Sequence, residues 1–175
     1  VHMLTLKGIL PPTQASGNRF TRTERNHLLY DGIATWIVDS SGNVMIERSI
    51  TSYRTNALGL ADPSYLDIET MFTLMEIRYQ YNARMVTRFI LPRFKLADDN
   101  NPIPAGAAVA TPSIVKQEVI ALFTLLRDNG LIENLDEFIE NVVVERDTTD
   151  VNRVNVLLPP DLINQFRILA GQIQF

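Results

Sequence analysis

The sequence has no cysteine and only two histidines among its 175 residues. The missing cysteines exclude disulfides, thiolate metal ligands and cysteine nucleophiles, and they suit a reducing compartment. One of the histidines lies in Val1–Met3, which resembles a remnant of cloning. A hydrolytic triad would then depend on His27 alone, and a half-buried or surface polar role explains that residue better. A metal site built on several histidines is excluded.

Other signatures of function are also absent. No apolar run approaches the roughly 20 residues of a transmembrane helix, and a net charge of −4 argues against a nucleic-acid partner. The glycines are scattered singly, without the strand-to-helix context of a phosphate loop. The acidic pairs Asp98–Asp99 and Asp147–Asp150 lack the alternation of a calcium loop, so turn formation explains them better. We therefore predict no metal, no cofactor, no nucleic acid and no membrane partner.

The composition that is present is that of a globular domain. Hydrophobic residues make up 46% of the chain and charged residues 21%, and a chain of this length can bury a sizeable core. We expect residues 1–3 to be the cloning remnant and residues 4–20 to be an extended segment, because glycine and proline punctuate it. Residues 21–175 are predicted to form a single domain.

Helix signals occur in four places. Thr21 and Glu24 have the spacing of a capping box and predict a helix over residues 22–30. Ser64 and Asp67 resemble a second capping box ahead of a long helix from about residue 65 to residue 90. Two shorter helices are predicted over residues 112–129 and 135–141. The apolar residues of the long helix recur every three or four positions and predict a broad covered face: Ile68, Met71, Phe72, Met75, Tyr79, Val86 and Phe89.

β-branched and aromatic residues predict the strands. Residues 33–38 and 44–51 flank a turn-forming stretch and are typical of a hairpin. Further strands are expected over residues 142–146 and 154–158, with a long last strand from Asn164 to Phe175. The predicted fold class is therefore mixed α/β, as a layered sandwich in which two main helices pack on a largely antiparallel sheet.

The long loop over residues 91–110 leaves an alternative open. Loops of this length often carry contacts or function, so a small α/β ligand-binding or enzymatic domain with its site there is the rival hypothesis. A deep pocket lined by titratable groups of shifted pKa would favour it. The basic residues at the end of the long helix fit a solvated or protein-contacting face better than an RNA site.

A series of short motifs carries a resemblance to a known family. Any one is weak, but they occur in a fixed order: Thr21–Asn26, Tyr30–Thr35, Ile46–Arg48, Ile50–Tyr53, Ser64–Asp67, Pro92–Asp99, Val144–Asp147, Asn152–Arg153, Leu157–Gln165 and Gln172–Phe175. Together they resemble the C-terminal portion of Mu-like contractile phage tail sheath proteins.

The resemblance implies a structural protein and no enzyme. Sheath subunits polymerise as stacked rings around a tail tube and contract, which drives the tube through the envelope of the target cell. The implied partners are other copies of the subunit, the tail tube protein and the baseplate, in a virion tail assembled in the host bacterial cytoplasm. A phage, a prophage and a bacteriocin-like device fit equally. The larger N-terminal part of a sheath subunit is expected to be missing, so the fragment itself can be monomeric.

The resemblance also implies where subunits meet. Terminal arms of sheath subunits add strands to a neighbour's sheet, so residues 164–175 are either such a link or an internal strand of this domain. Polar and charged residues are expected at a contact that shifts during contraction. The expected contact residues are Asn164, Gln165, Arg167, Gln172, Gln174 and Phe175, with Arg93, Lys95, Asp98 and Asp99 from the long loop.

Overall fold

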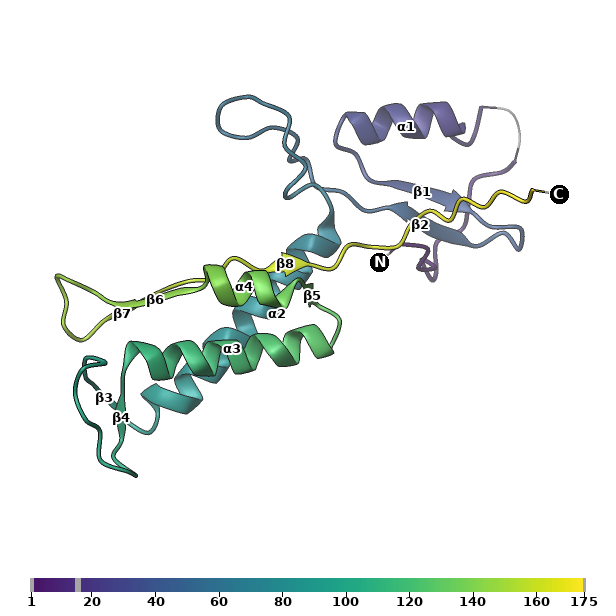
Figure 1. Ribbon diagram of the computed structural model, residues 1–175. Helices are drawn as coiled ribbons and strands as arrows, with labels where there is room; N and C mark the ends of the chain where they lie inside the picture. The colour runs from purple at the N-terminus through teal and green to yellow at the C-terminus, as the bar shows by residue number, and fades with distance from the viewer. Residues whose placement is uncertain (1, 15–16, 175) are drawn as a thin grey trace. The chain divides into compact units, whose positions relative to one another are not determined.

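The computed structural model describes residues 2–14 and 17–174, and its helices and strands are labelled in Figure 1. The chain divides into two compact units, described separately below. One unit contains the residues up to Phe72 together with those from Asn164 onward, and the other contains Thr73–Ile163. The mixed α/β class is confirmed. Within the described residues the strands form four two-stranded sheets, three antiparallel and one parallel, rather than one sheet.

The first unit is built around a hairpin and a capped helix. The helix α1 (Arg22–Tyr30) has the predicted capping box, because the Thr21 side chain accepts from the Glu24 amide and the Glu24 side chain accepts from the Thr21 amide. The strands β1 (Thr35–Val38) and β2 (Val44–Arg48) pair antiparallel, as predicted. The side chain of Asp39 closes their turn by accepting from two backbone amides.

The start of the chain pairs with the free edge of β2. The backbone amides of Met3 and Leu6 donate to β2 carbonyls, each at 2.8 Å, and the Ile46 amide donates to the Leu4 carbonyl at 3.0 Å. These bonds satisfy the edge of β2 that faces away from β1. The beginning of the segment expected to be extended therefore lies along this hairpin and forms an isolated β-bridge between Thr5 and Met45.

The long helix begins later than its sequence predicted. The helix α2 runs over Ile68–Met85 and continues as one π-helical stretch, η1 (Val86–Ile90). The predicted capping box at Ser64 is wrong, because the Ser64 amide and hydroxyl both bond Asp62 in a preceding turn. Asp67 instead pairs with arginines. The boundary between the two units falls inside α2, between Phe72 and Thr73.

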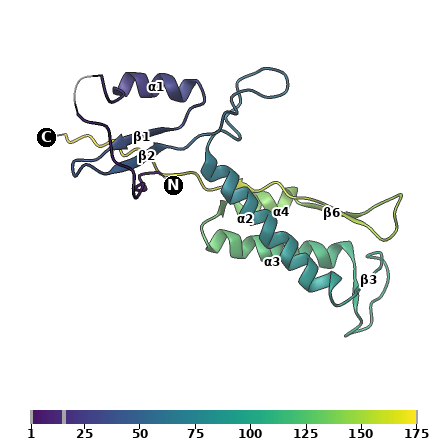
Figure 2. The same cartoon turned by 180° about the vertical axis from the view of Figure 1, so that it is seen from behind.

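The predicted covered face of α2 is wrong for most of its length. Ile77 and Phe89 are buried, whereas the side chains of Phe72, Met75, Tyr79 and Val86 are exposed. In the second unit α2 lies in front of α3 when seen from behind (Figure 2), and α3 contacts its Ile77 side. Within this chain the helix therefore buries Ile77 and Phe89, whereas most of the predicted face is exposed.

The second unit contains the remaining helices, both of which were predicted. In α3 (Pro112–Asp128) the Thr111 side chain accepts from the Ile114 amide, and Gly130 follows the helix with φ +71°. The short helix α4 (Leu135–Asn141) has the predicted bounds. The strands are short: β3 (Lys95–Leu96) with β4 (Val109–Ala110), β5 (Ile132–Glu133) with β8 (Asp161–Leu162), and β6 (Val143–Arg146) with β7 (Val154–Leu157).

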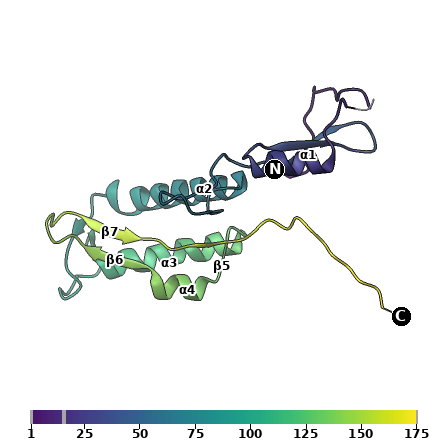
Figure 3. The same cartoon turned by 90° about the horizontal axis from the view of Figure 1, so that it is seen from above.

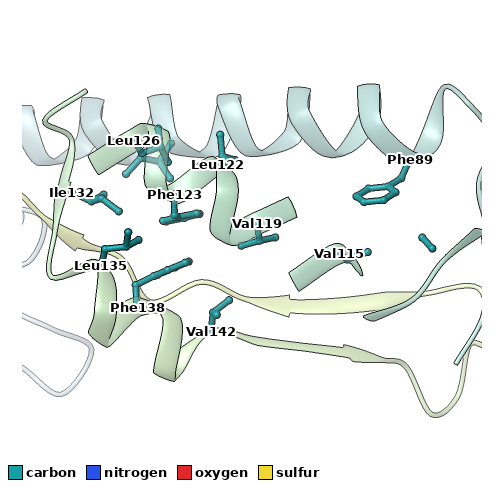
Figure 4. Close-up of a cluster of buried hydrophobic side chains, with 12 residues drawn as sticks. Phe89, Val115, Val119, Leu122, Phe123, Leu126, Ile132, Leu135, Phe138 and Val142 are labelled. Atoms are coloured by element: carbon teal, nitrogen blue, oxygen red, sulfur yellow. The ribbon is translucent and has the colours of Figure 1, made fainter. Parts of the chain in front are cut away.

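The core of the second unit lies between α3, α4 and the β6–β7 hairpin (Figure 4). Its centre is the ring pair Phe123–Phe138, stacked with centroids 3.9 Å apart and planes 11° apart. Both rings are essentially inaccessible to solvent. Val119, Leu126, Ile132 and Val142 surround them, each 2% exposed or less, so this cluster holds the helices against the hairpin.

The predicted long last strand is wrong for this chain alone. The last strand of the structure is β8, and residues 163–174 have no regular structure. In Figure 3 they run as an extended thread toward the C-terminus. Within the described part of the chain, no backbone hydrogen bond forms from Asn164 to Gln174. An extended segment without a partner strand has no ladder to join, which is the physical reason for the difference. Phe175 lies outside the described residues.

Candidate inter-subunit surfaces

The terminal segment, residues 164–174, exposes its apolar side chains. Phe166, Ile168, Leu169 and Ile173 are each between 81% and 92% exposed. The predicted contact residues Asn164, Gln165, Gln172 and Gln174 are exposed as well. Large apolar side chains held in water without a partner mark an interaction surface more often than a structural one.

Arg167 differs from the rest of the segment because it is held inside its own unit. Its Nη1 donates to Asp67 Oδ2 at 3.1 Å, and its Nη2 lies 3.7 Å from Glu69 Oε2. Arg48 binds the same Asp67 carboxylate from β2 through two hydrogen bonds of 3.1 and 3.3 Å. The predicted contact residue Arg167 is therefore an anchor at the base of the segment.

The charge of Asp67 is stabilised by these two arginines. Partial burial by itself raises the pKa of the carboxyl group, but the hydrogen bonds and charges of Arg48 and Arg167 outweigh it and hold the pKa below its usual value. The Asp67 carboxylate is therefore ionised at neutral pH and can keep its ion pairs with Arg48 and Arg167. Sequence reasoning missed these two contacts of Asp67 because they join positions 19 and 100 residues apart.

The predicted loop residues divide into engaged and free side chains. Asp98 accepts from Arg146 on β6 at 2.8 Å, and Asp99 accepts from the Ser113 amide at the start of α3 at 3.0 Å. Hydrogen bonds from Thr111 and Ser113 lower the pKa of the Asp99 carboxyl. Arg93, at φ +59°, and Lys95 on β3 are exposed. The two aspartates are thus hydrogen-bonded to β6 and α3, whereas the two cations face solvent.

A hollow in the second unit provides the place where the rival hypothesis can be tested. It has a volume of about 240 Å³ and lies beneath the end of α2 and η1, lined chiefly by Met85, Phe89, Phe94 and valines of α3 and β7. Burial raises the pKa of Tyr81, which lines it, and Lys95 is its one charged lining residue. Tyr81 is thus a single group of shifted pKa in an otherwise largely apolar lining, and not the cluster that the rival hypothesis requires. The ligand-binding or enzymatic hypothesis therefore gains no support here.

The acidic turn near residue 147 is structural. Asp147 accepts from the amides of Thr149 and Asp150 at 2.8 and 3.0 Å and from the Asn155 side chain at 2.8 Å. Hydrogen bonds led by the Thr149 hydroxyl lower the pKa of Asp147. This confirms that the carboxylate organises the β6–β7 turn. Among residues 2–14 and 17–174, no three acidic or histidine side chains converge as a metal site requires.

The exposed apolar side chains of the terminal segment and of α2 are typical of a structural domain that contacts other chains. Comparison with known proteins agrees with this class. Residues 61–175 match the family described as phage tail sheath C-terminal domain. The chain is also 44% identical over 167 residues to the Mu-like prophage FluMu tail sheath protein of Haemophilus influenzae, an alignment that covers 95% of this chain and 34% of that protein.

The chain therefore belongs to the phage tail sheath C-terminal domain family. This confirms the resemblance to Mu-like sheath proteins, and the family is structural rather than enzymatic. The chain spans about a third of the length of the relative that it matches. Within the described residues, no helix has the length and hydropathy needed to cross a bilayer.

Proposed function

We propose that this chain is the C-terminal portion of a contractile tail sheath subunit. Such subunits polymerise as stacked rings around a tail tube and shorten to drive the tube through the target cell envelope. The observation that carries the proposal is the 44% identity to a Mu-like tail sheath protein along 95% of the chain. The partners would be other copies of the subunit, the tube protein and the baseplate, in the tail of a virion assembled in the host cytoplasm.

Electron microscopy of the full-length sheath protein that carries this sequence tests the function. Expressed without tube or baseplate, the protein should form hollow tubes of stacked rings, because sheath subunits carry their own assembly contacts. A monodisperse monomer at every concentration would contradict the proposal. Circular dichroism of the same sample separates failure to assemble from failure to fold.

We further propose that the terminal segment links neighbouring subunits by adding a strand to a neighbour's sheet. Three features support this: the segment is extended, its backbone groups lack partners within the described chain, and Arg167 fixes its base. Phe175 would extend the same link. Deletion of residues 168–175 should abolish tubes while leaving the spectrum of the folded domain unchanged, because Arg167 and the core are retained. Intact tubes after this deletion would refute the link.

The charged loop supplies a second set of proposed contacts. Arg93 and Lys95 face solvent, and Asp98 is more than half exposed although it pairs with Arg146. Rim charges of this kind steer association more than they stabilise it. Replacing both cations by glutamate should slow tube growth and weaken its salt dependence, measured by light scattering. Growth at the wild-type rate would exclude Arg93 and Lys95 from the contact.

A further inference from the structure

The connection between β2 and α2 (Figure 1) contains a short turn that exposes two leucines. We define the leucine loop as residues 55–61, in which Leu58 is 83% and Leu60 is 62% exposed. The Asn56 side chain accepts from the amides of both leucines at 2.9 and 3.1 Å, and the Asn56 amide donates to the Leu60 carbonyl at 2.9 Å. Because these bonds fix the turn, the two side chains are held in water on a preorganised backbone.

The tip of the leucine loop presents apolar side chains and free hydrogen-bond acceptors. No residue of the loop carries a charge. The amides of Leu58, Gly59 and Leu60 are all bonded within the loop. Within the described residues, no hydrogen bond reaches the carbonyls of Ala57, Leu58 or Gly59. A partner that covers this tip must therefore bury leucine side chains and supply donors to these carbonyls.

The hollow of the second unit has the complementary character. Its lining is largely apolar, and its volume is about 240 Å³. Removal of one leucine side chain from a well-packed core leaves an apolar cavity of about 150 Å³, so the hollow has room for one or two leucine side chains. Two exposed residues of the lining carry donors, Lys95 and Asn152, and within the described chain neither side chain has a hydrogen bond or an ion pair.

One wall of the hollow is the π-helical stretch η1, which contributes Phe89 and Ile90. Single π-helical turns are rare and occur frequently at functional sites. The Phe89 side chain is buried, whereas Ile90 is 67% exposed, so the hollow reaches solvent on the Ile90 side. A side chain from another molecule can therefore enter the hollow while the core of the second unit stays folded.

We propose that the leucine loop of one copy inserts Leu58 and Leu60 into the hollow of a second copy, where Lys95 donates to the free carbonyls of the tip. The inference rests on the proposed sheath function, which supplies the second copy, and it names a contact separate from the terminal segment. The loop belongs to the first unit and the hollow to the second. The contact is therefore heterologous, and it propagates from copy to copy.

The area of this contact fits an assembly better than an isolated pair. The two leucines expose on the order of 250 Å² together, far below the roughly 800 Å² per partner of a stable complex. A single contact of this size leaves two copies apart in dilute solution. Repetition along an assembly gives it strength, because each bound copy holds the next loop close to its hollow.

Disulfide trapping tests the contact without altering the leucines or the apolar lining. A57C places a thiol beside the tip and N152C places one at the edge of the hollow, in full-length protein whose other cysteines, if any, are replaced by serine. N129C is the matched control. Asn129 is also an exposed asparagine of the second unit, but it lies at the end of α3, about 21 Å along the helix from Val115 of the lining.

In assembled full-length protein, a mixture of A57C and N152C should form the mixed dimer at least about tenfold faster than a mixture of A57C and N129C. The reason is that bound neighbours meet at an effective concentration in the millimolar range. A chain that carries both A57C and N152C should give a ladder of linked multimers on a denaturing gel. Equal rates in the two mixtures would overturn the inference. A linked monomer without multimers would also overturn it, because the loop would then fill the hollow of its own chain.

A pair of truncations separates this inference from the sheath function. L58A/L60A removes both anchors and should reduce tube formation at least about tenfold, whereas I9A/L10A removes two exposed apolar side chains elsewhere in the first unit and should leave assembly unchanged. Circular dichroism checks that both variants fold. Normal tubes from L58A/L60A would refute the role of the leucine loop and leave the sheath function standing. Absence of tubes from the wild type would refute the sheath function itself.

Discussion

The stacked rings of Phe123 and Phe138 allow a quantitative prediction of how much the core contributes to the free energy of unfolding. F123A removes a fully buried ring whose neighbour lies 3.9 Å away in a nearly parallel plane. Phe-to-Ala substitutions at such sites cost about 3–5 kcal/mol, because transfer and cavity terms add. The upper half of that range applies here, because α3, α4 and the β6–β7 hairpin all pack around the site and limit its collapse.

The assay is urea unfolding followed by far-ultraviolet circular dichroism. With a urea m-value of about 2 kcal/mol/M, the midpoint should fall by about 2 M. L125A is the matched control, because Leu125 lies on the same helix and is half exposed; its cost should stay below about 1.5 kcal/mol. A double-mutant cycle with F138A should show a coupling of about 0.5–1.5 kcal/mol from the ring pair. A loss below about 1.5 kcal/mol for F123A at an unchanged m-value would refute the packing argument.

Three further predictions concern the anchor, a helix end and domain organisation. R167Q should raise the pKa of the Asp67 carboxyl toward its usual value, measured by NMR titration. Because the pKa of Asp67 is lowered in the folded state, its stabilisation of the fold is present above about pH 4 and is lost as pH falls through the folded-state pKa. An unchanged pKa in R167Q would contradict the anchor. G130A should cost about 1 kcal/mol in urea unfolding, because φ is +71° there although no neighbouring atom obstructs a Cβ; no loss would contradict this backbone argument. Residues 21–175 should unfold in a single calorimetric transition, since α2 runs through both compact units; two separate transitions would refute a single domain.

Local signals in the sequence predicted most of the regular structure. The capping box at Thr21 was predicted because it acts within a few residues, and the Asp39 turn, the Thr111 cap and Gly130, described with the fold, are equally local. Ser64 was the exception, because Asp62 competes for it through a tighter local turn. Short-range hydrogen bonding decided each of these cases.

Contacts between distant positions were not predictable in the same way. Nothing in the spacing of Arg48, Asp67 and Arg167 indicates that they meet, because tertiary folding brings them together across 19 and 100 positions. The pairing of Met3–Leu6 with β2 was missed for the same reason, since so short a stretch has no periodicity to detect. The sequence therefore indicates where to look for a candidate site but not which contacts its residues make.

The two largest errors share one cause. The last strand and the covered face of α2 were both inferred correctly as patterns: alternation in the segment and apolar periodicity in the helix are present in the sequence. A pattern of this kind records the environment in which a segment is buried, whether its partner belongs to the same chain or to another. Within the described residues the segment forms no ladder, and most of the predicted helix face is exposed. Both errors therefore came from assigning to contacts within one chain a pattern that does not say which chain supplies the partner.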